Sequence, residues 1–206
     1  MVNQNEVRVE VKRGAAVRPI IPALARLRTD VFRDWPYLYD GDPNYEERYL
    51  ATYVQSPRAA VVVACVGEAI AGAATCLPLA DETGDVQAPF LARGWDPAQF
   101  FYYGEAVLRR ELRGRGIGVA IFAAREAHAR AVSDCDFAAF CGVVRSPDHP
   151  ACPPDFVPLD GFWTRRGFTR RPDLVCRMAW KEVGEEEERE HDLVFWMKSL
   201  RGAPLP

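Results

Sequence analysis

The 206-residue sequence lacks several features that would place it in a membrane or on nucleic acid. No run approaches the roughly 18 apolar residues that a membrane-spanning helix needs. Basic residues are not in excess, because 26 Lys and Arg stand against 29 Asp and Glu and the net charge is −3. Residues 1–13 alternate valines with charged side chains, which is not the pattern of a signal peptide. We therefore expect a cytoplasmic protein that binds neither a membrane nor nucleic acid.

The six cysteines also lack a recognisable pattern. No two form a C-x-x-C pair, and several fall within apolar runs, so neither a zinc site nor a disulfide framework is expected. We predict reduced, mostly buried thiols and no bound metal. The chain length and the 49% hydrophobic content suit one domain, so we predict a single domain over residues 1–206 with its core at about 6–200.

Two common phosphate-binding loops are excluded by residues that are missing. A P-loop ends in Gly-Lys-Ser/Thr, and no lysine occurs between Lys12 and Lys181. A dinucleotide-binding G-x-G-x-x-G that begins at Gly114 requires a glycine at the position of Val119. The sequence nevertheless has three glycines at alternate positions within residues 113–118.

This glycine-rich segment separates an apolar, strand-like run, 100–108, from an alanine-rich, helix-like run, 119–131. The glycines let the backbone turn sharply and bring successive N–H groups toward an oxyanion, and the start of the helix adds partial positive charge. The arginine side chains add forked donors suited to a pyrophosphate. We interpret the segment as a phosphate cradle formed by Arg113, Gly114, Arg115, Gly116, Ile117 and Gly118.

The cradle resembles the acetyl-CoA signature of the GCN5-related N-acetyltransferase (GNAT) superfamily, Arg/Gln-x-x-Gly-x-Gly/Ala, at Arg113, Gly116 and Gly118. Residues 159–168 are similar to the late helix of that family, which ends in a Gly-Phe pair. The resemblance implies a mixed α/β fold, in which helices flank a central, mostly antiparallel sheet with splayed fourth and fifth strands. It also implies acetyl-CoA as the cosubstrate, with its pantetheine bound to the backbone of Ala106, Val107 and Leu108.

The hydrophobic pattern predicts an element order that agrees with this resemblance. Apolar runs predict seven strands, at about 6–12, 59–66, 68–78, 100–108, 137–145, 174–182 and 193–200. Helices are predicted at about 20–34, 45–55, 86–93, 119–131 and 159–168. The proline-rich residues 146–158 are predicted to form an irregular loop.

Glu105 is the only ionisable carboxylate in the apolar run 100–108, which suits a base that removes a proton from an ammonium group through water. Some members of the family use a glutamate of this strand in that way. Substrate binding and an ion pair with an arginine are the alternatives. Many relatives carry a tyrosine acid where this chain has Trp163, which cannot donate a proton at useful pH. Tyr103, or its neighbour Tyr102, is then the candidate to supply the proton, and the alternative is that CoA leaves as a thiolate and takes its proton from water.

Three other residues have side chains that could take part in catalysis, but their sequence context does not favour a catalytic role. Cys141 has no predicted His or Asn partner, so we interpret it as small, buried packing. His128 falls on the apolar face of the helix at 119–131 and is expected in the core. His149 lies in the proline-rich loop, where a role as a proton acceptor or substrate contact is the minor alternative.

The loop at about 35–43 combines aromatic and acidic side chains, which suits an amine that carries positive charge. The resemblance implies that this loop lines the acceptor site, and we take Tyr37, Tyr39 and Asp40 as substrate-binding residues. The predicted function is transfer of an acetyl group to a primary amine, of a small molecule or a peptide, by direct attack in a ternary complex. A non-catalytic acyl-CoA sensor or scaffold is the alternative, favoured by Trp163. The resemblance is also compatible with a homodimer.

Overall fold

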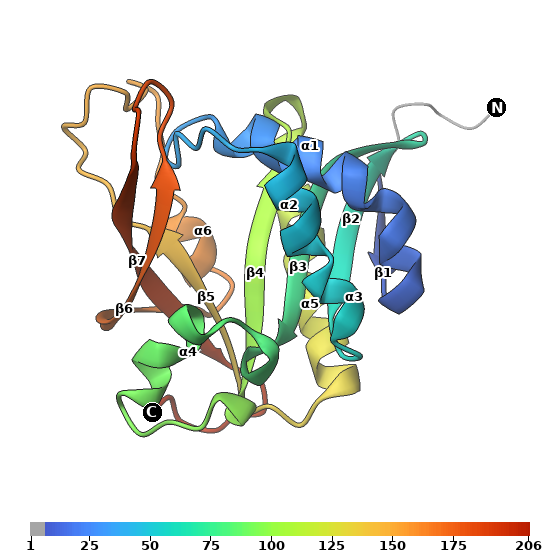
Figure 1. The fold of residues 1–206 in the computed structure, drawn as a ribbon. Helices are drawn as coiled ribbons and strands as arrows, with labels where there is room; N and C mark the ends of the chain where they lie inside the picture. Colours follow the sequence, from blue (N-terminus) through green and yellow to red (C-terminus); the bar gives the residue numbers. More distant parts are fainter. Residues whose placement is uncertain (1–6) are drawn as a thin grey trace.

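Seven apolar strands pair into one sheet, which is the frame of the molecule (Figure 1). The structure is a computed structural model that describes residues 7–206, except for the side chains of Pro43 and Arg48. The spatial order of the strands is β1-β2-β3-β4-β5-β7-β6. Their bounds are β1 Val7–Lys12, β2 Ala60–Val66, β3 Ala69–Pro78, β4 Phe100–Leu108, β5 Phe137–Val143, β6 Thr169–Lys181 and β7 Glu188–Ser199.

Helices cover both faces of this sheet. The α-helices are α1 Ile21–Phe32, α2 Pro43–Leu50, α3 Thr52–Gln55, α4 Gly84–Leu91, α5 Ile117–Val132 and α6 Asp160–Thr164. Short 3₁₀ helices, η1 to η4, span Gly14–Ile20, Leu79–Asp81, Pro97–Gln99 and Arg110–Leu112. Figure 1 shows α1, α2 and α3 in front of the sheet and α5 behind it. In the described part of the chain, no helix is long and apolar enough to cross a membrane.

Strand β4 illustrates how the sheet divides the core into two layers. Phe100 and Tyr102 belong to the buried cluster on the α1 side, while Phe101 and Tyr103 belong to the cluster beside α5. Successive side chains of a strand point to opposite faces, so a strand covered on both sides becomes a continuous apolar run. This is why residues 100–103 contain four aromatic residues in succession.

The contact between β4 and β5 is the one parallel pairing in the sheet, and it is short. Only Phe100, Phe101 and Tyr102 pair with β5, at Phe137–Ala139. Against β3, strand β4 shifts register between Tyr103 and Ala106, which is a β-bulge that changes the direction of the strand. The two central strands therefore separate after Tyr102 and leave a gap in the middle of the sheet. The predicted mixed fold, with a mostly antiparallel sheet and splayed fourth and fifth strands, is confirmed.

The prediction of one continuous helix at 45–55 is wrong, because the chain forms two helices there, α2 and α3, that meet at Ala51. The Thr52 hydroxyl donates to the Tyr49 carbonyl at 2.7 Å. Such a bond from a side chain to a nearby carbonyl competes with the helical hydrogen-bond pattern. The short helix predicted at 86–93 is present as α4, shifted by two residues.

The C-terminal elements also differ from the prediction at their ends. Helix α6 stops at Thr164, well before the predicted end at 168, and a turn follows in which Gly167 has a φ of +83°. Strand β6 begins at Thr169 rather than at 174. A register shift between Arg171 and Val175 accommodates the intervening residues, which include a proline, so pairing with β7 continues on both sides.

Candidate active site

The gap between β4 and β5 leaves backbone open in the middle of the sheet. Beyond Tyr102, β4 pairs only with β3, and β5 pairs only with β7 beyond Ala139. The edge of β4 that faces β5 therefore has no strand partner at Ala106, Val107 and Leu108 in the described part of the chain, and Ala106 is exposed there. Free N–H and C=O groups on such an edge can hydrogen-bond to a ligand that lies along the strand. The predicted pantetheine-binding residues lie on this edge; they are Ala106, Val107 and Leu108.

The phosphate cradle lies where η4 leads into α5. Gly114 and Gly116 have φ values of +73° and +79°, a conformation that residues with a side chain rarely adopt. Gly116 is the N-cap of α5, and no side chain caps this helix, so the N–H groups of its first turn remain available. Arg113 and Arg115 are exposed on the same segment. These features fit a pyrophosphate, which the helix dipole and the two guanidinium groups would attract.

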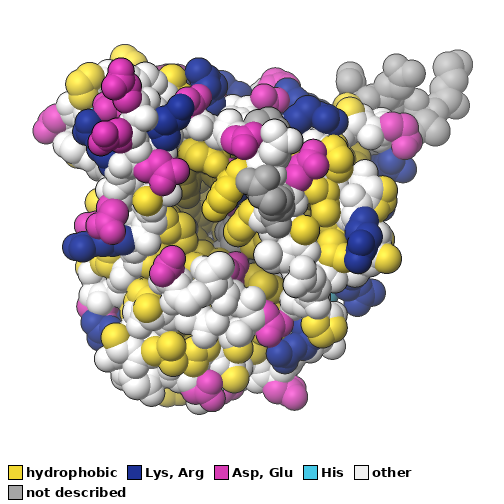
Figure 2. All heavy atoms as spheres, in the orientation of Figure 1, with side chains coloured by type: hydrophobic (Ala, Val, Ile, Leu, Met, Phe, Trp, Pro, Cys, Tyr) yellow, Lys and Arg dark blue, Asp and Glu magenta, His cyan; other side chains and the backbone are white. Residues whose placement is uncertain are grey.

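A hollow opens on the α1 side of the gap. Figure 2 shows it near the centre of the molecule, lined largely by hydrophobic side chains and with acidic side chains at its edge. In the same orientation, Figure 1 places it between α2, the segment that carries α4, and the β6–β7 hairpin. The hollow is therefore a candidate entrance for an acceptor, on the face of the sheet opposite α5.

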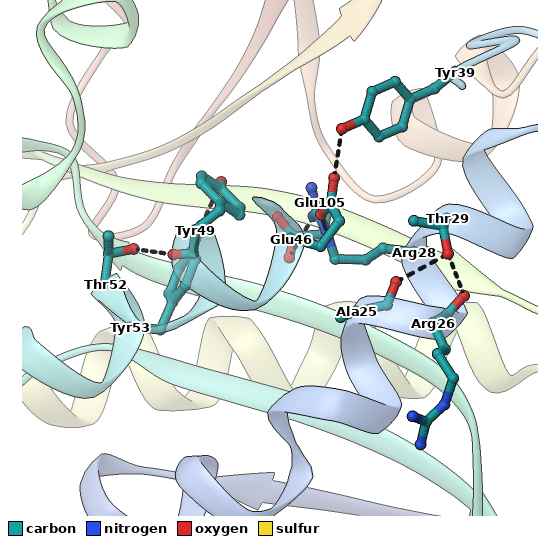
Figure 3. Close-up of polar contacts among 10 residues, drawn as sticks. All are labelled: Ala25, Arg26, Arg28, Thr29, Tyr39, Glu46, Tyr49, Thr52, Tyr53 and Glu105. Atoms are coloured by element: carbon teal, nitrogen blue, oxygen red, sulfur yellow. Dashed lines mark hydrogen bonds and ion pairs between the residues drawn. The ribbon is translucent and has the colours of Figure 1, made fainter. Parts of the chain in front are cut away.

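Glu105 lies on the α1 side of β4 and forms an ion pair with Arg28 of α1 (Figure 3). Its Oε1 is 2.7 Å from an Nη of Arg28, and the two side chains are only 7% and 11% exposed. The Nε of Arg28 donates to Glu46 of α2, and the Tyr39 hydroxyl donates to the same carboxylate at 2.8 Å. A chain of polar contacts thus runs from the loop after α1, through α2 and α1, to the bulge in β4.

The surroundings of Arg28 keep its guanidinium charged. Burial lowers the pKa of Arg28, but Glu105, Tyr49 and Glu46 together raise it above its ordinary value. Glu105 is therefore not an isolated carboxylate in an apolar run, because Arg28 approaches it from another element.

A second carboxylate, Glu82, approaches the same region from the loop after β3. The Tyr53 hydroxyl donates to its Oε1 at 3.3 Å, and the Tyr49 and Tyr53 hydroxyls are 3.0 Å apart. Burial raises the pKa of Glu82, and the nearby charge of Glu105 raises it further. Burial also raises the pKa values of Tyr49 and Tyr53. Their hydroxyls therefore stay protonated and act as hydrogen-bond donors at neutral pH.

The two tyrosines considered as proton donors point to opposite faces of the sheet. The Tyr102 hydroxyl lies 3.1 Å from Sγ of Cys141, on the α1 side. Tyr103 is buried beside α5, with its ring 6.3 Å from that of Phe122. Burial raises the pKa of Tyr103, and its hydroxyl has no hydrogen-bond partner among residues 7–206.

Trp163 covers the β5 side of the gap. Its ring lies 3.1 Å from the position that a Cβ on Gly142 would occupy, so Gly142 makes room for the indole. Its ring also packs edge to face against Phe140 and Trp196, with centroids 5.0 and 5.1 Å apart. The family's tyrosine position is thus filled by a well-packed side chain that carries no acidic hydroxyl.

Tyr37 is the predicted acceptor-binding residue that lies beside the gap. Burial raises its pKa, and the groups near enough to affect that pKa include Cys141, Arg28 and Glu105. Its carbonyl accepts hydrogen bonds from Arg145 at 2.9 Å and from the Trp180 indole at 3.1 Å. The loop between α1 and α2 is therefore fastened to the β5 and β6 ends of the sheet, with the Tyr37 ring held in place.

The other two predicted acceptor-binding residues are engaged elsewhere. The Tyr39 hydroxyl is bound to Glu46, as described above. The Asp40 carboxylate forms ion pairs with Arg33 at 2.9 Å and with Lys181 at 2.8 Å. Asp40 therefore connects the loop to β6 at the surface, and both of its oxygens face cations of the protein itself.

The histidines do not join the site. His128 of α5 is buried, and its Nε2 lies 2.8 Å from the Arg58 carbonyl, which agrees with its expected place in the core. His149 packs against Trp35, with ring centroids 5.0 Å apart, and holds the proline-rich loop onto the loop after α1. His191 stacks on Trp180 in the β6–β7 hairpin.

Two residues of the site, Arg28 and Glu82, were not predicted from the sequence. Arg28 lies four residues after Leu24 and four before Phe32, so it falls within the apolar stripe of α1. A charged residue inside an apolar stripe is a signal for a buried partner. Glu82 follows β3 in an acidic stretch and has no comparable signal in the sequence.

The splayed strands, the glycine-rich start of α5 and the hollow opposite it make up the geometry that the resemblance to acetyltransferases implies. Residues 24–168 match the model of the Acetyltransferase (GNAT) family. This match spans more than half of the chain, and the chain therefore belongs to the GNAT family. No curated protein sequence matches it significantly.

Solved structures with the same fold cover nearly the whole chain. The ribosomal-protein-alanine N-acetyltransferase from Brucella melitensis has a TM-score of 0.60 at 16% identity, over 92% of this chain and 99% of that chain. The yncA protein from Salmonella typhimurium, solved with its cofactor acetyl-CoA, has a TM-score of 0.59 at 13% identity, over 98% of each chain. An N-acetyltransferase from Staphylococcus aureus Mu50 has a TM-score of 0.60 at 11% identity, over 96% of this chain and 100% of that chain. At these identities the similarity establishes the fold alone.

Proposed function

We propose that this chain is an acetyl-CoA-dependent N-acetyltransferase that acts on a primary amine by direct attack in a ternary complex. The observation that carries the proposal is the gap between β4 and β5, with an uncapped, glycine-rich helix start at one end and the Glu105 carboxylate on the opposite face. Membership of the GNAT family and the bound acetyl-CoA of one structural neighbour support the same cosubstrate. We propose that the reaction takes place in the cytoplasm.

Each part of the site has a proposed role in this transfer. The glycine-rich segment 113–118 holds the pyrophosphate, and the backbone of residues 106–108 binds pantetheine. The amine nitrogen attacks the thioester carbon, a C–N bond forms and the C–S bond breaks, with its electron pair left on sulfur. Glu105 accepts the proton of the amine through water, and the backbone N–H of Ala106 stabilises the oxyanion. Tyr103 is the proposed donor of the proton that sulfur finally receives.

The acceptor is proposed to enter through the hollow and to contact Tyr37 first. An aromatic ring close to the carboxylate of Glu105, with Glu82 near that same carboxylate, suits an amine with positive charge. Tyr39 is proposed to act by positioning Glu46, and Asp40 by fixing the loop. The proposed acceptor is a primary amine of a small molecule or of a peptide.

The test begins with the cosubstrate, because no acceptor has to be known. Isothermal titration of the purified chain should give micromolar binding of acetyl-CoA and CoA and none of ATP. Arg113→Ala should weaken CoA binding about tenfold through the lost phosphate contact. An amine library screened for release of free CoA thiol then identifies the acceptor. Lack of acetyl-CoA binding would remove the proposal.

A second candidate is a non-catalytic acyl-CoA sensor, and the observation that favours it is Trp163 at the family's tyrosine position. Such a protein binds acetyl-CoA but releases no thiol with any amine. Glu105→Gln separates the two candidates once an active amine is found, because an enzyme loses turnover and keeps its CoA affinity.

A further inference from the structure

A buried arginine on the α5 side of the sheet has no role in the site as described. Arg125 lies in α5, and the residue is only 1% exposed. Its guanidinium carbon is 4.7 Å from the centre of the Tyr103 ring and 4.4 Å from that of Phe122. Among residues 7–206 it forms no ion pair, and its Nε has no hydrogen-bond partner.

Such an arginine is unfavourable if it serves only the fold. Burial lowers the pKa of Arg125, because a charge in apolar surroundings loses its hydration. The aromatic faces of Tyr103 and Phe122 offset part of this penalty. Buried charges in proteins are nevertheless normally paired with an opposite charge. An unpaired buried cation next to a ligand-binding gap therefore indicates an anionic partner that the reaction itself supplies.

The neighbours of Arg125 place its guanidinium close to the bulge in β4. Cys76 of β3 and Tyr103 of β4 are opposite each other in the register at this point, and both are near enough to affect the pKa of Arg125. Glu105 and Tyr53, on the other side of the sheet, affect it as well. The charge of Arg125 therefore acts across β4 at the place where this strand leaves β5.

The departing sulfur needs such a charge because its proton donors are poor. The indole of Trp163 has no acidic hydroxyl. Burial raises the pKa of Tyr103, which makes this hydroxyl a weak acid. When the C–S bond breaks, the electron pair on sulfur therefore has to be stabilised until a proton arrives from Tyr103 or from solvent.

We propose, resting on the acetyl transfer above, that Arg125 stabilises the negative charge that develops on the CoA sulfur, in place of a hydroxyl acid at position 163. The guanidinium acts by its field across β4 and needs no contact with the cosubstrate, so Arg125 is a charge-stabilising residue rather than a catalytic one. The ligand feature that it favours is a thiolate.

The test measures this preference directly and requires no acceptor. CoA and desulfo-CoA are titrated into the purified full-length chain at a series of pH values that spans ionisation of the free CoA thiol. A nearby positive charge lowers the pKa of the bound thiol by about 1–3 units. The affinity for CoA relative to desulfo-CoA should therefore rise about tenfold or more with pH.

Three variants separate the charge of Arg125 from its packing. Arg125→Met keeps the length and removes the charge, so the affinity ratio should become independent of pH while desulfo-CoA still binds. Arg125→Lys keeps the charge and should restore the rise in part. Arg130→Met is the matched control, because Arg130 lies on the same helix but is 44% exposed and already paired with Glu126, so its removal should leave most of the rise in place.

A ratio that stays flat with pH in the wild-type chain would overturn the role of Arg125 and leave acetyl-CoA binding intact. Failure of the wild type to bind either ligand would overturn the proposed function and, with it, this role.

The melting temperature gives an independent measurement. Arg125→Met should melt at or above the wild-type temperature, because an unpaired buried charge is removed. A marked fall in melting temperature, with the pH-dependent rise retained, would instead assign Arg125 to packing.

Discussion

Glu105 of β4 and Arg28 of α1 form a buried ion pair, with Oε1 and Nη 2.7 Å apart, that joins the bulged central strand to the helix in front of it. Glu46 of α2 binds a different nitrogen of the same guanidinium, its Nε. Arg28 is therefore held between two carboxylates that belong to different elements. This arrangement fixes the distance between the bulge in β4 and the helices that border the hollow.

The two carboxylates that hold Arg28 should differ in what their removal changes. Glu105→Gln should reduce turnover by about 100-fold or more, because the proposed base is lost, with CoA affinity unchanged. Both variants should lose stability, because removal of one partner of a buried ion pair costs about 3–5 kcal/mol, but Glu46→Gln should keep its turnover per folded molecule. Thiol release, titration with CoA and thermal unfolding measure the three quantities.

Equal turnover per folded molecule in Glu105→Gln and Glu46→Gln would contradict the base role of Glu105. If Glu105 serves only to hold Arg28, its Gln variant should lose stability as Glu46→Gln does and keep its turnover per folded molecule. The pair is a suitable comparison because both substitutions remove one charge from the same guanidinium and keep the size of the side chain.

The phosphate cradle can be tested with two glycines that share a backbone conformation. Gly116 has a φ of +79° at the start of α5, and Gly94 has a φ of +72° in the turn after α4. At both positions an added Cβ meets no atom within 4 Å. Alanine at either site should cost about 1 kcal/mol of stability through backbone strain.

Only Gly116→Ala should weaken CoA binding, by about tenfold, because it alters the helix start that faces the phosphates. Isothermal titration with CoA, alongside thermal unfolding of both variants, measures the difference. Equal CoA affinity in the two variants would show that the start of α5 does not hold the phosphates.

The features of the fold that could be predicted from the sequence are the local ones. The four aromatic residues that open β4 and the glycines that open α5 depend on neighbours within a few positions, and their patterns identified both elements. The break between α2 and α3 was not predicted, because the bond from Thr52 to the Tyr49 carbonyl competes with helical pairing in a way that apolar spacing does not record.

The features of the site that were not predicted depend on contacts between distant segments. Arg28 precedes Glu105 by 77 positions in the numbering, and only the packing of α1 on β4 brings them together. Likewise, the sequence predicts that Asp40 binds a ligand, whereas in the structure its carboxylate forms an ion pair with Lys181 of β6. Charged residues on different elements carry no shared sequence pattern, so their pairing could not be inferred from composition or period.

Trp163 invites a substitution that restores the family's tyrosine. Trp163→Tyr should destabilise the protein by about 1–3 kcal/mol, because the smaller ring leaves space between Gly142 and Trp196. Trp163→Phe should be destabilised to a similar degree and serves as the packing control. If a hydroxyl at this position can protonate the departing thiolate, the Tyr variant should turn over faster than the Phe variant with the same amine, measured as thiol release. Equal rates would place the sulfur out of reach of residue 163.

Glu82 predicts a dependence of stability on pH whose sign follows from its burial. Burial raises the pKa of Glu82 above its ordinary 4.5, so the folded protein binds this proton more tightly than the unfolded chain does. The stability that the protonated carboxyl contributes is present below about pH 4.5 and is lost as the pH rises through the raised pKa. Glu82→Gln cannot titrate and keeps an acceptor for the Tyr53 hydroxyl.

Measured from pH 4 to 8, the melting temperature of Glu82→Gln should therefore match that of the wild type near pH 4 and exceed it increasingly as the pH rises through the raised pKa of Glu82, with a constant excess above that pKa. Glu47→Gln, at an exposed carboxylate of α2, is the control and should show no such trend beyond the general effect of one lost charge. A constant difference in melting temperature between Glu82→Gln and the wild type over this range would mean that Glu82 has the same pKa in the folded and unfolded chains. The burial of Glu82 beside Tyr49 and Tyr53 would then have no effect on the charge of its carboxylate.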